Sequence, residues 1–220
     1  MKLCTYFGNP WIGIYAKTND KIALIPKDAN EKFEQIIAEN LKVEVHKALI
    51  NGSNILGIYT SMNSNGIILP SFVHEEELKD IKKTGLNICV SSENRNAHGN
   101  NIVANDKGGI INPYVPNHEK KKMEDALGIE LVGALASGYS TVGSACLATN
   151  KGFLTHFNTT DEEMKIIEDA LKTKGNRGSV NFGTGFIPLG AIVNNHGYIA
   201  GEKTTAFELG NIEASFGFVK

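Results

Sequence analysis

The chain has 220 residues, of which 41% are hydrophobic and 21% charged, and its formal net charge is −2. These fractions are ordinary for a globular protein and exclude a largely disordered chain. Arg95 and Arg177 are the only arginines among the 22 basic residues. Nucleic-acid-binding domains carry a basic excess and contact bases and phosphates through arginine, so the composition argues against a dedicated binder of naked nucleic acid.

No segment is typical of a secretion signal or of a lipid-facing helix. The N-terminus lacks an apolar signal core, and the longest uncharged stretches, 131–150 and 178–201, are interrupted by Gly, Ser, Thr and Asn. Cys4, Cys89 and Cys146 are far apart and set among apolar residues, so we expect buried, reduced thiols without a disulfide. The sequence predicts a cytoplasmic protein that does not enter a membrane.

Internal repetition is the most informative feature of the chain. Five stretches share an apolar residue, a glycine and a strand-like run, with the glycines roughly 44 residues apart. These glycines are Gly13, Gly57, Gly99, Gly143 and Gly190. The lap from the last glycine through the chain ends to the first has nearly the same length. A fixed period of this kind indicates five copies of one structural unit.

Each repeat continues with the same order of elements. After the glycine run comes a hairpin turn rich in residues that tolerate positive φ. The turns lie at 19–21, 63–66, 105–108, 150–152 and 194–197, and the second strands at 22–26, 67–70, 110–113, 153–156 and 198–201. A helix follows, and then a third extended run at 43–48, 86–91, 129–135 and 179–182.

Helix starts carry capping signals. Thr160 with Glu163 and Thr205 with Glu208 fit the capping-box pattern, and Asp28 with Glu31 fits it in the first repeat. Apolar residues at helical spacing continue these segments and also mark helices in the second and third repeats, at Leu78 with Ile81 and at Met123, Ala126 and Leu127. The first four repeats are therefore predicted to be ββαβ units, and the fifth has the first three of these elements.

The fifth repeat has no third strand, because the sequence ends just after its helix, whereas residues 3–7 are strand-like and have no helix of their own. We expect residues 3–7 to supply the missing strand and close the ring, which protects edge strands. The predicted fold is α/β: a five-bladed α/β propeller forming one domain over 1–220. The repeats are expected at about 9–52, 53–94, 95–138, 139–183 and 184–220 plus 1–8.

Three segments, Asn96–Asn100, Val142–His156 and Thr204–Leu209, together with the repeat count, make the chain resemble the translation initiation factor 6 family of archaea and eukaryotes. The resemblance covers essentially the whole chain and implies the pentein fold, five quasi-equivalent units about a pseudo-fivefold axis. His98 stands where the family usually has leucine. The chain also lacks the acidic or phosphorylatable tail of eukaryotic members, so it looks archaeal.

The resemblance implies a function without catalysis. Members bind the large (50S) ribosomal subunit on its intersubunit face and block joining of the small (30S) subunit sterically, since two partners cannot share one surface. Near-neutral charge fits docking mainly on ribosomal proteins, with a minor rRNA contact left open. A monomer is expected. A binding module for some other particle is the alternative from another class.

Other penteins are guanidine-modifying enzymes whose cysteine nucleophile lies near the end of the fifth unit. Residues 188–220 contain no cysteine, so we predict no catalytic residue and disfavour this alternative. The six histidines show no paired spacing, and each is expected to be a solvated or capping residue. The glycine-rich stretches lack a following Lys-Ser/Thr, so no phosphate loop is predicted. No metal or cofactor is predicted.

One position breaks the repeat pattern. The residue directly after the repeat glycine is small or apolar in four repeats, and in the third it is Asn100, a bulky polar residue. The five residues are Ile14, Ile58, Asn100, Ser144 and Ala191. Either it contacts a partner, or it bonds to local backbone as turn asparagines do. Loops before the repeat glycines should share one rim, which is a natural docking surface. The candidate ribosome-binding residues are Asn9, Asn94, Arg95, Asn100 and Tyr139.

Overall fold

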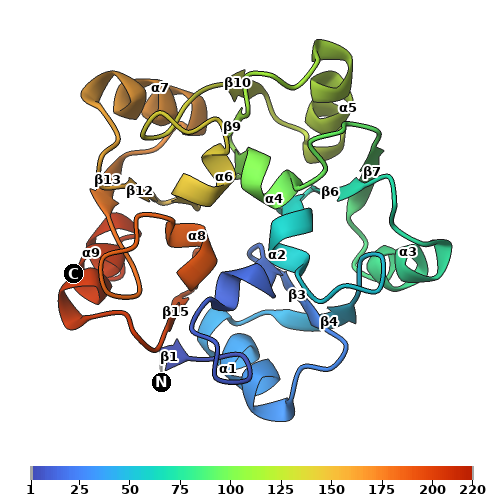
Figure 1. The fold of residues 1–220 in the computed structure, drawn as a ribbon, viewed down its shortest axis with the longest axis horizontal. Helices are drawn as coiled ribbons and strands as arrows, with labels where there is room; N and C mark the ends of the chain where they lie inside the picture. Colours follow the sequence, from blue (N-terminus) through green and yellow to red (C-terminus); the bar gives the residue numbers. More distant parts are fainter. Residues whose placement is uncertain (1, 220) are drawn as a thin grey trace.

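The computed structural model describes residues 2–219, and Figure 1 shows five similar units arranged around a common centre. Each unit consists of a short helical turn, two strands, a long helix and a third strand. The order of elements matches the predicted repeat, with the helical turn as an addition.

The elements of the five units have these bounds. Unit 1 contains η1 (Ile12–Ile14), β2 (Lys17–Thr18), β3 (Ile22–Pro26), α1 (Glu31–Leu41) and β4 (Glu44–Ala48). Unit 2 contains α2 (Leu56–Tyr59), β5 (Ser61–Met62), β6 (Gly66–Pro70), α3 (Glu75–Lys82) and β7 (Asn87–Ser91). Unit 3 contains α4 (His98–Asn101), β8 (Ile102–Ala104), β9 (Gly109–Ile111), α5 (Asn117–Leu127) and β10 (Leu131–Gly133). Unit 4 contains α6 (Val142–Ala145), β11 (Cys146–Ala148), β12 (Phe153–His156), α7 (Asp161–Leu171) and β13 (Gly175–Gly178). Unit 5 contains α8 (Ile187–Gly190), β14 (Ala191–Val193), β15 (Tyr198–Gly201), α9 (Ala206–Ser215) and, from the N-terminus, β1 (Leu3–Cys4).

Within residues 2–219 the strands form five separate three-stranded sheets, and none of these sheets closes on itself. In each sheet the first two strands are antiparallel, and the third lies parallel to the second. The predicted pairing of the N-terminus with unit 5 is found, with Leu3 opposite Ala200 and Cys4 opposite Gly201. The strand is shorter than residues 3–7, because a tight turn begins at Tyr6.

The apolar core clusters extend from one unit into the preceding one. Phe33 and Ile37 of α1 pack in one cluster with Ile192 and Ile199 of unit 5. In the same way, the cluster around α7 includes Val103 and Ile110 of unit 3. A long helix therefore buries its apolar face against the preceding sheet, so each unit depends on its neighbour for stability.

The strand-like run predicted at the repeat glycine is wrong in units 1 to 4, because these residues form the short helical turns at the centre of Figure 1. In unit 5 the predicted run is largely confirmed, since Ala191–Val193 is β14. A Cβ on Gly57 would lie 1.8 Å from the carbonyl oxygen of Gly13, and one on Gly99 would lie 1.9 Å from that of Gly57. Only glycine permits this approach between units. In units 1 to 4 the repeat glycine is the second residue of the short helix. In unit 5 the second residue is Pro188 and not Gly190, since α8 begins at Ile187.

Two local predictions also need correction. The N-cap of α1 is Asn30 rather than Asp28, with its Oδ1 accepting from the N–H of Phe33 at 2.9 Å. The capping boxes at α7 and α9 are confirmed. The third strand of unit 4 is Gly175–Gly178 and not 179–182. Its first residue, Gly175, lies against the ring of Phe153, where a Cβ would come within 2.4 Å of the ring. Glycine in a strand often marks such a close approach, so this strand forms although its sequence is polar.

Candidate functional site

The fold gives the molecule two unlike faces. In each unit the second strand starts at the Asn-rich hairpin and runs toward the N-terminus of the long helix, and the parallel third strand ends beside it. We call the side with the helix N-termini, the tight turns and the short central helices the turn face. Its tight turns are Tyr6–Asn9, Ile50–Ser53, Ala136–Tyr139 and Val180–Thr184, with the loop 92–97 in the remaining place. The opposite side, with the hairpins, is the hairpin face.

On the hairpin face, buried asparagines join neighbouring units. The side-chain amide of Asn19 donates to the carbonyl of Asn63 at 2.8 Å, and that of Asn63 donates to the carbonyl of Asn105 at 3.1 Å. Asn105 donates to Thr149, and Asn194 donates back to Asn19, both at 3.1 Å. The side-chain amides of these asparagines therefore find their hydrogen-bond partners within the protein.

The hairpin tips are satisfied in a similar way. Asp106 accepts from the N–H of Ser64 at 2.8 Å, and Asp20 accepts from the N–H of Asn195 at 2.8 Å. Lys151 donates from Nζ to the carbonyl of Asn195 at 2.7 Å. These polar groups therefore hold the units together. An exception on this face is the buried Oδ1 of Asn195, which accepts no hydrogen bond from residues 2–219.

The tight turns on the turn face are held by glutamates. Glu77 of α3 accepts from the N–H groups of Asn51 and Gly52, both at 2.7 Å. Glu163 of α7 and Glu208 of α9 accept in the same way from the turns at 137–138 and 182–183. Burial alone would raise the pKa of Glu77 and of Glu208, but the backbone donors hold both below their ordinary value.

Unit 1 is the exception, because Phe33 stands where the other long helices carry glutamate. The ring of Tyr6 packs against Phe33 and Tyr15, with centroids 5.2 and 4.2 Å apart. Its hydroxyl donates to Asp28. Aromatic packing thus replaces a carboxylate under the first turn.

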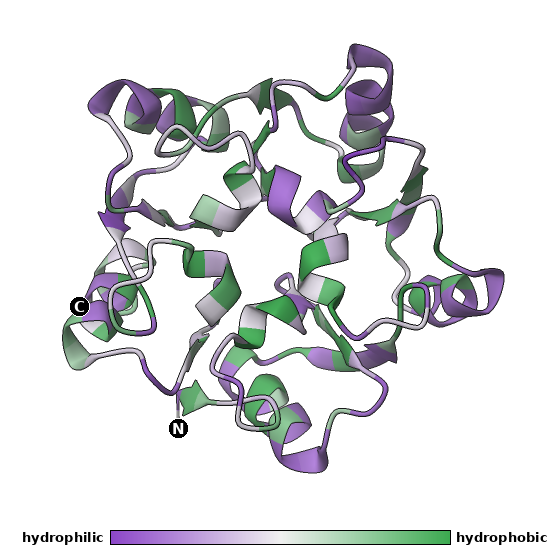
Figure 2. Ribbon diagram, in the orientation of Figure 1, coloured by the Kyte–Doolittle hydropathy of each residue, from purple (hydrophilic) through white to green (hydrophobic). Residues whose placement is uncertain are grey.

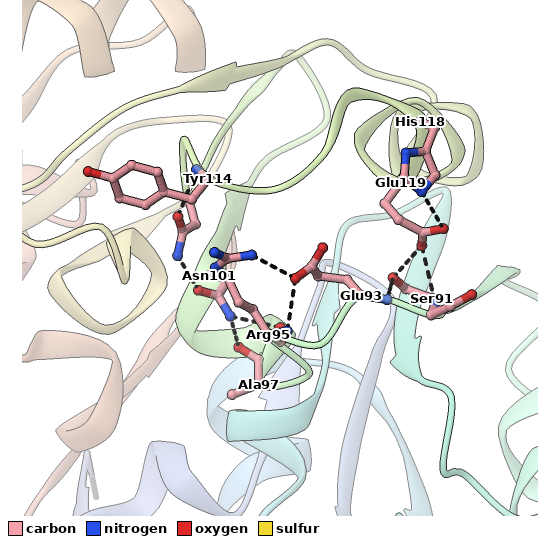
Figure 3. A network of polar contacts seen from close by, with 10 residues as sticks. Ser91, Glu93, Arg95, Ala97, Asn101, Tyr114, His118 and Glu119 are labelled. Carbon is pink, nitrogen blue, oxygen red and sulfur yellow. Dashed lines mark hydrogen bonds and ion pairs between the residues drawn. The ribbon is translucent and has the colours of Figure 1, made fainter.

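The structure separates the predicted site residues into two kinds. Asn9 is engaged inside unit 1, since its Oδ1 accepts from the N–H of Trp11 and its Nδ2 donates to the hydroxyl of Tyr15, both at 2.9 Å. Asn94, Arg95 and Tyr139 are exposed on the turn face. The guanidinium of Arg95 pairs with Glu93 at 2.9 Å, as Figure 3 shows.

Asn100 and Asn101 differ sharply. Asn101 is buried, donates to the carbonyls of Arg95 and Ala97 at 3.0 Å, and accepts from the amide of Asn112 at 2.8 Å (Figure 3). Asn100 is half-buried, and its side chain makes no hydrogen bond to any residue of 2–219. Local backbone bonding therefore describes Asn101. In Figure 2 the short helix α4, which carries both, is the most hydrophilic of the five.

The exposed aromatic side chains gather on the turn face. All six exposed aromatic side chains within residues 2–219 lie in the tight turns, in the loops leading to the long helices or at a helix N-terminus. They are Phe7, Tyr114, Tyr139, Phe157, Phe182 and Phe207. Of these six residues, the sequence analysis predicted only Tyr139 as a candidate binding residue. The missed signal was a phenylalanine directly before Gly8 and Gly183, at turn positions that usually take Asn, Asp or Gly.

An axial cavity of about 50 Å³ opens between the short central helices. It is lined by Gly13, Gly57, Gly99 and Lys17 among others. Burial lowers the pKa of Lys17 to about 8. The volume suits a few water molecules rather than an organic substrate.

The remaining chemistry-bearing side chains are mostly enclosed. His74 is exposed at the N-cap position of α3, which fits the prediction of solvated or capping histidines. His98 and His156 are buried, so the prediction is wrong for these two. Burial lowers the pKa of His98 to about 4. All three cysteines are buried, as predicted, and desolvation raises the pKa of the Cys4 and Cys146 thiols to about 12. Such thiols are poor nucleophiles at neutral pH.

Within 2–219, no group of three or more His, Cys, Asp and Glu side chains is placed to hold a metal ion. Over the same part of the chain, no helix combines the length and apolar character needed to cross a bilayer.

Comparison with known proteins identifies the family. The sequence model described as eIF-6 family matches residues 1–215. A translation initiation factor 6 of Picrophilus torridus is 35% identical over 213 residues, which cover 97% of this chain and 98% of the relative. The proteins of that name from Methanocorpusculum labreanum and Thermoplasma acidophilum are 34% and 36% identical, covering 96% and 92% of this chain and 96% and 93% of the relatives. The chain belongs to the eIF-6 family.

Proposed function

We propose that this protein is a translation initiation factor 6 that binds the large ribosomal subunit through its turn face and thereby prevents the small subunit from joining. The relatives' name supports a role in translation initiation. One observation carries the choice of face. All six exposed aromatic side chains and the unbonded Asn100 side chain lie on the turn face, whereas the hairpin face spends its polar groups on contacts between units. Exposed aromatic residues are enriched at protein interfaces.

The block requires only a rigid body of adequate affinity. A factor that covers the surface used by the small subunit makes the two associations mutually exclusive. We take the five units to form one closed pentein propeller and a single domain. Two contacts between units 5 and 1 support this: a Cβ on Gly13 would lie 1.9 Å from the Pro188 carbonyl oxygen, and Asn194 bonds to Asn19. We expect a cytoplasmic monomer.

Charge favours ribosomal proteins over rRNA as the main contact. Lys120, Lys121 and Lys122 of α5 each pair with a carboxylate of the same helix, at 3.7, 3.2 and 2.6 Å. Arg95 pairs with Glu93. Because phosphate binding depends on free cationic groups, these pairs leave a limited role for rRNA.

A catalytic role is disfavoured by the placement of the thiols. A guanidine-modifying enzyme needs a reactive thiolate, and burial opposes ionisation of the thiols of Cys4, Cys89 and Cys146.

Sedimentation tests the function. The purified protein is mixed with isolated archaeal large or small subunits and run on sucrose gradients, and subunit joining is followed by light scattering with and without it. We expect comigration with large subunits only and a dose-dependent loss of joining. Comigration with small subunits, or binding to large subunits that leaves joining unchanged, would contradict the proposal.

A further inference from the structure

Two phenylalanines on the turn face occupy backbone conformations that their side chains disfavour. Phe7 has a φ of +48° and Phe182 a φ of +65°, both in the left-handed region. A bulky residue there is an outlier, because its Cβ crowds the backbone. Phe182 is 82% exposed and Phe7 65%, so both rings remain largely open to solvent, although the Phe7 ring also packs edge-on against Tyr6 with centroids 4.9 Å apart.

The sister turns show what local structure alone would select. At the corresponding place, the turn after β4 has Asn51 with a φ of +52°, and the turn after β10 has Ser137 with a φ of +55°. Asparagine tolerates this conformation, and serine is small. Backbone preference explains these two residues but not the phenylalanines, and burial does not explain them either. Conformational strain retained at an exposed position indicates a use outside the folded chain.

The two phenylalanines lie on turns that are tied together. The amide of Asn181, directly before Phe182, donates to the carbonyl of Pro10 at 3.0 Å, three residues after Phe7. Figure 1 shows units 5 and 1 as neighbours around the centre. The two turns therefore meet at the junction where β1 joins unit 5.

We infer that Phe7 and Phe182 form a two-ring anchor for an apolar surface of a ribosomal protein on the large subunit. This inference rests on the proposed function and names the partner's chemistry at one part of the turn face. Phenyl rings offer no hydrogen bonds, so they bind by burial in an apolar pocket. Carboxylates stand beside both turns, with Asp28 accepting from the Tyr6 hydroxyl and Glu208 from the Phe182 N–H. Negative charge there opposes the rRNA backbone.

The test exploits the opposite demands of folding and binding. Phe7→Asn, Phe182→Asn and the double variant place a tolerant residue in the left-handed conformation, so the melting temperature should stay equal or rise. Affinity for purified large subunits, measured by fluorescence anisotropy of the labelled protein, should fall at least tenfold in the double variant. Lys172→Asn makes the same kind of change at an exposed left-handed residue that caps the C-terminus of α7, away from the turn face, and should leave affinity within twofold of the wild type.

Three results would overturn the anchor. The double variant could bind large subunits as tightly as the wild type, or it could melt well below it, which would make the rings structural. The loss of affinity could also be reproduced on protein-stripped rRNA, which would assign the rings to base stacking. Failure of the wild type itself to bind large subunits would instead contradict the proposed function.

Discussion

The two faces of the molecule are built from loops of the same five repeats, yet they treat the repeat differently. On the hairpin face, four units place asparagine at the same site, and these side chains bond from one unit to the next. On the turn face the equivalent positions diverge, with Phe7, Asn51 and Ser137 in sister turns. The repeated residue is therefore kept where neighbouring units bond to each other, and it varies on the face where we place the partner. The comparison yields predictions that separate stability from binding.

Removing residues 1–7 should have the largest effect. The truncation deletes β1, exposes the edge of β15 and removes the buried side chains of Cys4 and Tyr6. We expect a loss of several kcal/mol in the free energy of unfolding, measured by urea titration. A truncated protein that melts within about two degrees of the full chain would show that the strand does not secure the fold.

Asn63→Ala tests the hairpin face. Asn63 donates to the carbonyls of Asn105 and Leu127 and accepts from the N–H groups of Asn65 and Gly66. The variant should lose about 3 kcal/mol of stability, since several buried partners are left unpaired. Asn65→Ala is the matched control and should lose less, because Asn65 is exposed and its side chain makes a single hydrogen bond, to the carbonyl of Leu127. Affinity of the folded fraction for large subunits should not change. Weaker binding by folded Asn63→Ala would contradict the division between the faces.

Asn100→Arg tests the turn face in the opposite sense. The side chain is unbonded within residues 2–219, so the melting temperature should barely move. Affinity for large subunits should fall at least tenfold, or about 1.4 kcal/mol. Asn101→Ala provides the contrast, with a loss of about 2 kcal/mol of stability and unchanged binding. Unchanged affinity in well-folded Asn100→Arg would remove Asn100 from the interface.

Acid titration gives the smallest effect and compares unit 1 with the others. The pKa of Glu208 in the folded protein lies below its ordinary value of 4.5, so its contribution to stability is complete above that pH. The contribution is lost as the pH falls below 4.5 toward the folded pKa. Glu208→Gln should therefore show a shallower loss of melting temperature between pH 5 and about pH 3. Phe33→Leu in unit 1 is the control and should leave that slope unchanged, whereas an identical slope in Glu208→Gln would contradict the role of the carboxylate.

The sequence predicts the repeat because its signals are local. Asn-rich hairpins and the boxes Thr160–Glu163 and Thr205–Glu208 need only neighbouring residues, and they are confirmed. The central helical turns were not predicted, because glycine is required there by contacts with another unit. An example is the carbonyl of Gly13, which lies against Gly57. The same holds for Gly175, whose strand depends on the ring of Phe153.

The candidate site was predictable in part for a similar reason. A break in the repeat marked Asn100 as unusual, and the loops before the repeat glycines pointed to Asn94, Arg95 and Tyr139, which are exposed. Asn9 has the same sequence context, but its side chain bonds to Trp11 and Tyr15. Exposure and hydrogen bonding decide which of these residues are free, and neither can be read from spacing.

Hydroxyl-radical footprinting of the protein bound to large subunits tests the central claim most directly, because it reports side-chain accessibility on both faces at once. We expect Phe7, Tyr139 and Phe182 to become protected on binding, whereas the exposed His196 of the hairpin face should stay as reactive as in the free protein. Protection of His196 together with unchanged reactivity of the three aromatic residues would contradict the assignment of the turn face.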